Sequence, residues 1–430
     1  MKPFFAILIA QLICLGPLGA KEDMDMIKAN YYYSHLAFYK AIPYYEKLAE
    51  KENNVNIYSR LGDCYRLTGS IDKAAGAYRK ALDMPKYGDL VMLRYAQMEM
   101  MLMQYEEAAK WLQVYKDNNP RDRRVANLIA GCKSARDVWA AAPKKAATLL
   151  SFNTDHSEFA PAIWNGNLVF AADTAIKLHK KKSNWTGAAC YNIYALTCDG
   201  TGNCGDDYHT LGTSKNMDIA FHDGPATFSS DGDTMYFTRT RFNEKFFSRG
   251  SVMNKDSIVV LETMMATDYD ESLQKFRTVK PFTFNNTNFS VAHATVSPNG
   301  RMMIFSSTME GAGSDLYLCT RNPKGKWLRP KNLGAFINTE GEEVFPYFAN
   351  DTTLIFASDG LAGLGGLDIY VAHWDSTLQN FAHAVNAGVP INSSYDDISM
   401  ALYPDGSGGY FSSNRPAEFK SDNIYFYRKD

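Results

Sequence analysis

Two hydrophobic patterns follow one another along the chain. In the first third, apolar side chains recur every three or four positions, which is the period of helices that bury one face. In the remainder, short apolar or aromatic runs alternate with Gly, Asp, Asn and Ser turns, as in an all-β domain of many short strands. We therefore predict a helical domain over residues 21–139, a linker over 140–147 and a β domain over 148–430.

A repeat of about 34 residues runs through the predicted helices. The small residues Ala41, Ala74 and Ala108 are 33 and 34 positions apart. A large apolar residue follows each of them four positions later, namely Tyr45, Tyr78 and Leu112. Small residues let two helices approach closely, and large ones fill the groove between them. This layout resembles the tetratricopeptide repeat (TPR), and the apolar stripe after Pro120 is typical of a capping helix.

The resemblance to tetratricopeptide repeats implies a concave face that binds protein partners and is lined by the first helix of each pair. The residues at these positions are Asn30, Tyr33, Asn56, Asp63, Arg66 and Gln97. A merely solvated helix face is an equally good interpretation of each of them.

Four methionines cluster in the third repeat unit, at Met98, Met100, Met101 and Met103. They suit either an adaptable peptide-binding surface or core filling, and we favour core filling.

The β domain contains five copies of one unit, in which a strand, a tight turn and an aromatic strand follow one another. The five turns are Asn165-Gly166, Asp231-Gly232, Asn299-Gly300, Asn350-Asp351 and Asp405-Gly406. A strand with Tyr after Ile or Leu follows in four copies, at Tyr194, Tyr317, Tyr370 and Tyr425. A repeat of 53 to 55 residues with about four strands makes one propeller blade. We predict five blades, or six if residues 240–290 hide another. The repeats resemble WD40-like repeats of the TolB type.

The last copy lacks a fourth strand. Earlier copies have candidate fourth strands at residues 326–328 and 380–382, whereas the last copy stops at Asp430. A missing strand would leave an open sheet edge and an unclosed ring. Residues 147–153 contain an apolar run that has no place in the first copy, so we predict that they complete the last blade.

The first 20 residues read as a signal peptide. Lys2 precedes an apolar run over residues 4–15, and Leu18-Gly19-Ala20 supplies small residues at a cleavage point. Cys14 raises the alternative of a lipoprotein, but the preceding Leu12-Ile13 lacks the small residue that lipid attachment usually requires. We therefore favour simple cleavage and expect a periplasmic protein. The formal net charge of −2 gives no reason to expect nucleic acid as a partner.

Little in the sequence points to catalysis or to a cofactor. There is no Gly-x-Ser-x-Gly elbow, no phosphate-binding glycine loop and no zinc-binding helix, so we predict a protein that is not an enzyme and has no cofactor, metal or catalytic residue. Cys198 and Cys204 flank a turn-rich loop and could form a local disulfide. The same loop, residues 199–206, partly mimics a calcium loop without its closing glutamate, and we favour the disulfide-pinned hairpin.

The order of signal peptide, tetratricopeptide units and WD40-like propeller resembles the first two domains of PorE-type outer-membrane-associated proteins of the type IX secretion system. The resemblance implies a periplasmic scaffold, associated with the outer membrane, whose partners are envelope or secretion-system proteins. In that family an OmpA-like domain grips peptidoglycan, and since the sequence ends at Asp430 without one, we do not expect direct peptidoglycan contact. Two alternatives are a TolB-like role in envelope integrity and a propeller whose channel binds a small ligand or carries an enzyme activity.

Overall fold

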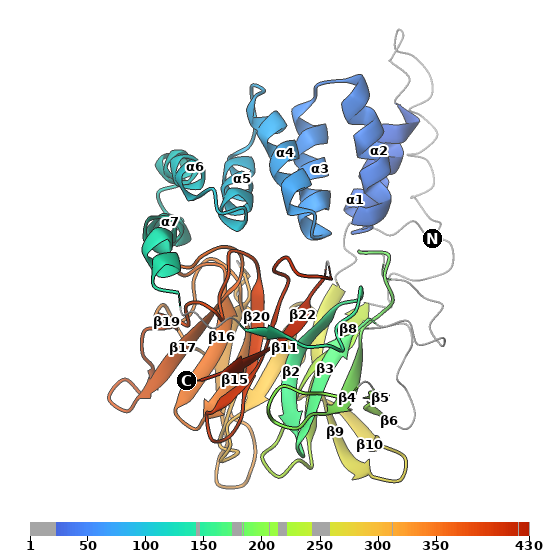
Figure 1. The fold of residues 1–430 in the computed structure, drawn as a ribbon, viewed down its shortest axis with the longest axis vertical. Helices are drawn as coiled ribbons and strands as arrows, with labels where there is room; N and C mark the ends of the chain where they lie inside the picture. Colours follow the sequence, from blue (N-terminus) through green and yellow to red (C-terminus); the bar gives the residue numbers. More distant parts are fainter. Residues whose placement is uncertain are drawn as a thin grey trace, which may run out of the picture.

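The computed structural model describes residues 23–142, 147–173, 183, 185–205, 207–213, 222–242, 259–311, 313–419 and 421–429. The predicted signal peptide with Cys14, and residues 143–146 of the predicted linker, lie outside these ranges. Within them, no helix combines the length and the apolar character needed to cross a membrane. A helical array sits on one face of a β-propeller (Figure 1).

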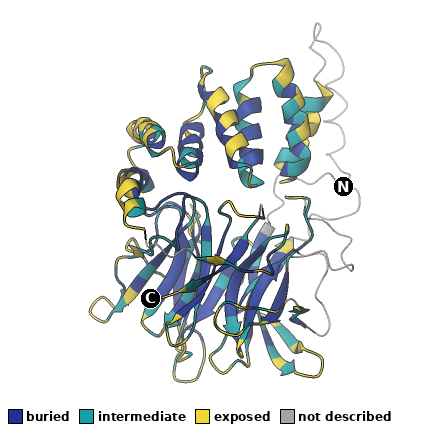
Figure 2. Cartoon of the chain, viewed as in Figure 1, coloured by how far each residue is buried: buried dark blue, intermediate teal, exposed yellow. Residues whose placement is uncertain are grey.

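Seven helices make up the described part of the array, and consecutive helices pack against each other. They are α1 (Met24–Ser34), α2 (Phe38–Lys51), α3 (Val55–Leu67), α4 (Ile71–Leu82), α5 (Asp89–Met101), α6 (Tyr105–Asn118) and α7 (Arg124–Ala140). Asp23 and Asn54 cap α1 and α3 by accepting hydrogen bonds from backbone N–H groups of the first turn. Figure 2 shows that the buried residues lie on the faces that the helices turn toward one another.

The small residues of the repeat allow the close helix packing that the sequence predicts. Ala41, Ala74 and Ala108 are completely buried. Gly62 of α3 lies against the ring of Tyr78 in α4, and a Cβ on Gly62 would be only 2.6 Å from the nearest ring carbons. A larger residue at position 62 would therefore push the two helices apart.

Five sheets form the five blades of the propeller, and their described strand pairs are antiparallel except for one in blade 2. Blade 1 contains β2 (Glu158–Trp164), β3 (Asn167–Ala172), β4 (Asn192–Thr197) and β5 (His209–Thr210). Blade 2 contains β7 (Asp223–Phe228), β8 (Met235–Phe242), β9 (Val259–Asp270) and β10 (Lys275–Pro281), with β6 (Gly212–Thr213) parallel to β10. Blade 3 contains β11 (Val291–Val296), β12 (Met302–Ser307), β13 (Asp315–Thr320) and β14 (Lys331–Asn332).

Blade 4 contains β15 (Glu343–Asn350), β16 (Thr353–Ser358), β17 (Asp368–Asp375), β18 (Asn380–Phe381) and β19 (Val385–Asn386). Blade 5 contains β20 (Asp397–Leu402), β21 (Gly408–Ser413), β22 (Asn423–Arg428) and the early strand β1 (Thr148–Leu149). The innermost strands contact one another in the closed order β2, β7, β11, β15, β20 and back to β2. The chain thus forms the five-bladed ring predicted from the sequence, and the described strands within residues 240–290 belong to blade 2.

The ring is closed by the strand that precedes blade 1. Thr148 and Leu149 pair with Phe426 and Tyr425 of β22, so β1 supplies the outer strand that the last sequence copy lacks. The candidate fourth strand at 326–328 is wrong, because Trp327 only forms an isolated bridge with Arg321. The outer strand of blade 3 is β14 instead, where Asn332 pairs with Tyr317.

In blade 4 the candidate at 380–382 is a strand at residues 380 and 381, but it is not the one that corresponds to the outer strand of blade 3. β18 pairs with the far end of β17, at Trp374 and Asp375. The strand that corresponds to β14 is β19, where Asn386 pairs with Tyr370. A two-residue strand carries too few positions to show an alternating pattern, so the sequence places it poorly.

A recurring asparagine joins each of four blades to the next. Asn153, Asn285, Asn338 and Asn392 each accept a hydrogen bond from a backbone N–H in the third strand of the preceding blade and donate one to the carbonyl of the same residue. For Asn338 these bonds are 2.9 and 3.0 Å long and bind Leu316. An amide side chain that satisfies both groups of one residue replaces a missing rung of the sheet.

After Asn153 and Asn338, the next residue fixes a buried acid at the start of the next innermost strand. Thr339 donates its N–H and its hydroxyl to Glu343, at 2.8 and 2.7 Å, and Ser358 donates a third bond. Thr154 binds Glu158 in the same way. Burial raises the pKa of both glutamates to about 7. The acids therefore belong to the connection between blades.

Candidate functional site

The sequence-predicted partner face of the array lies largely inside a hydrogen-bonded network. Asp63 of α3 is buried and accepts bonds from Tyr33 of α1 at 2.6 Å, Tyr78 of α4 at 2.7 Å and Arg94 of α5 at 2.5 Å. Asp63 thus ties four helices together. Desolvation, with the Asp63 carboxylate beside it, raises the pKa of the Tyr33 hydroxyl, so Tyr33 stays protonated as a donor.

Asn30 and Arg66 also have partners within the array. Asn30 accepts hydrogen bonds from Tyr45 at 2.8 Å and from Arg60. The Arg66 side chain donates to the Tyr78 hydroxyl at 3.4 Å. Among the six predicted positions, the side chain of Asn56 is exposed and that of Gln97 is half-buried, with no side-chain hydrogen bond found for either within the described residues. These two remain the candidates for contact with a partner.

The methionine cluster fills the core of the array for the most part. Met98, Met100 and Met101 are buried, whereas half of Met103 is exposed. Met103 has a positive φ of 60° in the turn between α5 and α6. Three of the four methionines therefore fit the core-filling interpretation.

A disulfide joins Cys198 and Cys204 in blade 1. Between them, Asp199 accepts hydrogen bonds from the backbone and side chains of Thr201 and Asn203. These bonds lower the pKa of Asp199 to about 2. The oxygen atoms that suggested a calcium loop are thus used by the turn itself, while Asp206 lies outside the described residues.

The array touches the propeller at separated points. On one side, Trp185 of blade 1 donates to the Leu67 carbonyl at 2.7 Å and packs edge-on against Phe38, with ring centroids 4.8 Å apart. On the other side, Ser394 donates to the Met101 carbonyl at the end of α5, at 2.9 Å. These contacts hold the turns between paired helices against the propeller.

A glycine-rich loop of blade 4 also contacts the array. Tyr105 of α6 donates to the Leu364 carbonyl at 2.9 Å, and Asn127 of α7 donates to the Gly360 carbonyl at 2.9 Å. Inside the propeller, Asp368 accepts the N–H of Leu364 at 2.7 Å and so fixes the loop from below. The loop joins β16 to β17, and no feature of its sequence indicates that helices rest on it.

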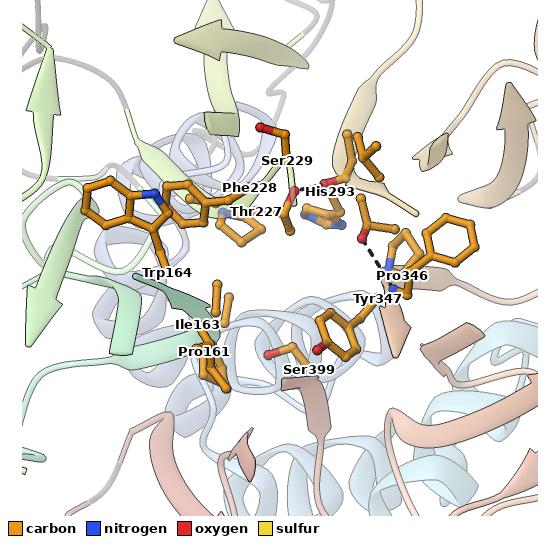
Figure 3. Close-up of a pocket in the computed structure, with 18 of the residues that line it drawn as sticks. Pro161, Ile163, Trp164, Thr227, Phe228, Ser229, His293, Pro346, Tyr347 and Ser399 are labelled. Carbon is orange, nitrogen blue, oxygen red and sulfur yellow. Dashed lines mark hydrogen bonds between the residues drawn. The ribbon is translucent and has the colours of Figure 1, made fainter. Parts of the chain in front are cut away.

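A cavity of about 230 Å³ lies at the centre of the propeller. All five innermost strands, β2, β7, β11, β15 and β20, line it, together with the hairpin turns of blades 1, 2 and 3 at the end away from the array. Figure 3 shows Trp164 and Phe228 on one side, His293 and Ser229 on a second, and Tyr347 with Ser399 on a third. None of the described residues that line the cavity is an acid, a lysine or an arginine.

Every innermost strand has a register shift beside the cavity. Four blades place a residue with positive φ there, namely Ala160, Gly224, His293 and Phe345. Positive φ is uncommon for residues with a Cβ, and a bulge changes the direction of the side chains that follow it. The next residue is proline in three of these blades, at Pro161, Pro225 and Pro346.

His293 is the one titratable side chain among the described lining residues that is not a tyrosine. Its ring stacks on Phe345 with centroids 4.1 Å apart, and its Nδ1 lies 3.2 Å from the hydroxyl of Ser306. Burial lowers the pKa of His293 to about 3, so the imidazole is neutral at physiological pH. The wall of the cavity therefore carries no net charge. Among the described residues, no group of three His, Cys, Asp or Glu side chains is placed to hold a metal ion.

Comparison of the sequence with protein-family models and with curated proteins gave no match. Solved structures with a similar fold include a TolB from Agrobacterium tumefaciens, with 13% identity, a TM-score of 0.35 and coverage of 60% of this chain and 71% of that one. The TolB of Acinetobacter baumannii has 12% identity, a TM-score of 0.33 and coverage of 72% and 70%.

A puromycin-hydrolyzing peptidase of Mycobacterium tuberculosis has 9% identity and a TM-score of 0.34 over 63% of this chain. This chain spans less than half of that peptidase, 46%. Since all three TM-scores lie below 0.5, these similarities carry no argument about function.

Proposed function

We propose that this chain is a non-catalytic scaffold of the cell envelope that holds protein partners. The observation that supports the proposal best is that two repeat domains are joined into one frame, by contacts that run from Trp185 at one end of the array to Asn127 near the other. Helical arrays and propellers both present large surfaces suited to protein contact. Among the described residues that line the cavity, there are also no converging acids or bases of a hydrolytic site.

The cellular role in this proposal is the one implied by the resemblance to PorE-type proteins. The chain would act in the periplasm, beside the outer membrane, with secretion-system or envelope proteins as partners. Tetratricopeptide-like arrays bind partners along the first helix of each pair, and Asn56 and Gln97 are the predicted positions that the internal network of this array leaves for such contact.

Site-specific photocrosslinking in intact cells tests the proposal. A photoreactive amino acid at Asn56 or Gln97 is expected to capture a membrane or secretion protein. The matched control is Glu271, which is exposed at the tip of the β9–β10 hairpin in the propeller. Capture at Asn56 and Gln97 but not at Glu271 supports a partner face on the array, and recovery of no envelope protein from either position counts against the scaffold.

Deletion of the gene separates the proposed role from a TolB-like one. Loss of a secretion scaffold is expected to block export of secreted proteins while the envelope stays intact. A leaky envelope with normal secretion would instead favour the envelope-integrity role.

A further inference from the structure

The wall of the propeller cavity offers mainly hydrogen-bond acceptors. Four lining residues are prolines, which have no N–H, at Pro161, Pro225, Pro298 and Pro346. The N–H groups of Ala160, His293 and Phe348 are directed to the hydroxyls of Ser412, Thr238 and Thr295, at 3.3, 2.9 and 3.4 Å. Since the innermost strands pair on one edge only, their other edge presents unpaired carbonyl oxygens, and seven of the lining positions offer no free N–H beside them.

Two of the hydroxyls in the wall use their protons on the protein. Thr227 donates to the Ala294 carbonyl at 2.6 Å, and Tyr347 donates to the Leu402 carbonyl at 3.1 Å. Their oxygen lone pairs can still accept. A molecule that fills the cavity must therefore bring hydrogen-bond donors of its own.

Charge narrows the class of ligand further. An anion would find no lysine or arginine in the described wall, and an ammonium group would find no carboxylate. Transfer of an unpaired charge from water into such a site is costly. The fit is therefore to an uncharged molecule with several hydroxyl groups.

Aromatic rings in the wall suit the apolar face of a sugar ring. Phe228 is half-buried and stacks on Trp164, with centroids 5.2 Å apart and planes at 20°. Tyr347 lies across the cavity from them (Figure 3). The volume of about 230 Å³ is below the ~300–1,000 Å³ of pockets for drug-sized ligands, so it matches one small ring.

We propose that the central cavity binds a neutral sugar, one ring at a time, as a free monosaccharide or as the end of a glycan. An extended peptide is the less suitable occupant, because its carbonyls need N–H donors and seven of the described lining positions offer none. The proposal is independent of the scaffold role, since a partner could bind the array whether or not the cavity is filled.

Saturation-transfer NMR and calorimetry on the full mature chain test the proposal. The probes are glucose, galactose, mannose and N-acetylglucosamine, with glucuronic acid, glucosamine and an uncharged end-capped hexapeptide for comparison. Binding of at least one neutral sugar, at least tenfold tighter than its charged counterparts, is expected. No binding of any neutral sugar, equal binding of the charged sugars or binding of the hexapeptide alone would each overturn the proposal.

Two substitutions locate the binding. Ile163 is a half-buried, apolar lining residue. Ile163→Trp would fill part of the cavity, so at least a tenfold loss of sugar affinity is expected. The matched control is Val385→Trp, on an exposed strand position of blade 4, with unchanged affinity. Phe228→Leu removes an aromatic face without adding bulk and is expected to weaken sugar binding about 3–10-fold. If the tryptophan variant fails to fold, this variant shows whether the sugar binds in the cavity. Unchanged affinity in a folded lining variant would refute binding at this site.

Discussion

Gly131 of α7 lies directly against the backbone of Gly363 in blade 4, so closely that a Cβ on Gly131 would overlap the Gly363 carbonyl oxygen. Among the glycines of the described chain, no other one lies so close to a residue of the other domain. The contact makes the small size of residue 131 a condition for the way the array sits on the propeller.

Replacement of Gly131 by alanine is therefore expected to loosen the junction. Alanine favours a helix over glycine by about 1 kcal/mol, yet overpacking against a backbone costs about 1–3 kcal/mol. We expect faster hydrogen exchange in residues 360–367 and a lower free energy of unfolding. The matched control is Gly76→Ala in α4, where nothing lies within 4 Å of the new Cβ. That variant is expected to be more stable by up to about 1 kcal/mol, and equal behaviour of the two variants would contradict the role of Gly131.

Asp63 provides a second prediction, within the array. Asp63→Ala leaves Tyr33, Tyr78 and Arg94 without their shared acceptor. Breaking a fully buried ion pair by removing one partner costs about 3–5 kcal/mol. Because Arg94 is partly exposed, we expect a somewhat smaller loss in the free energy of unfolding, about 2–4 kcal/mol. Urea unfolding measures the loss. Asn56→Ala, at an exposed position of the same helix, is expected to change stability by less than about 0.5 kcal/mol. A loss of the same small size for Asp63→Ala would mean that the network does not stabilise the array.

The blade architecture could be predicted from the sequence because each blade repeats long, aromatic strands around a turn. The closing strand followed from the same pattern, since an incomplete last copy and an unassigned apolar run at 147–153 match each other. The true outer strands could not be placed, because β14 and β19 are two residues long. The sequence did hold a further signal: Asn153, Asn338 and Asn392 are each followed five positions later by an acid that opens an innermost strand.

Neither the junction nor the cavity could be read from the sequence. Asn30, Tyr33, Asp63 and Arg66 stand where a concave face is expected, but spacing does not tell whether a polar side chain faces solvent or a neighbouring helix. The role of Gly131 could not be predicted either, because its partner, Gly363, is more than two hundred positions away in the sequence. The cavity is lined by short stretches from five separate blades, so only the closed ring brings its residues together.

The disulfide of blade 1 gives a third prediction. Cys198 and Cys204 close a loop of few residues, for which the chain-entropy model gives a stabilisation of about 2 kcal/mol. The double variant Cys198→Ser and Cys204→Ser is expected to lose this amount in urea unfolding and to become sensitive to proteases at residues 199–203. A reducing agent is expected to lower the stability of the wild type but not that of the double variant. Cys319 of blade 3 is free and buried in both proteins, so it serves as an internal control for reactions of thiols other than the disulfide. Equal stability of the oxidised wild type and the double variant would contradict a stabilising role.

The buried acid Glu343 makes stability depend on pH. Burial raises its pKa in the folded chain to about 7 from an ordinary value of 4.5, so between these values the folded state binds more protons than the unfolded state. Its contribution is therefore complete below pH 4.5 and is lost as the pH rises through 7. A shift of this size corresponds to about 3 kcal/mol at most.

Glutamine at position 343 resembles the protonated acid and does not titrate. Relative to the wild type, Glu343→Gln is expected to gain about 2–3 kcal/mol of stability between pH 4.5 and pH 8, measured by urea unfolding at both values. Glu106→Gln, at an exposed position of α6, is expected to show no such gain, and a parallel pH dependence of wild type and Glu343→Gln would mean that Glu343 is charged throughout this range.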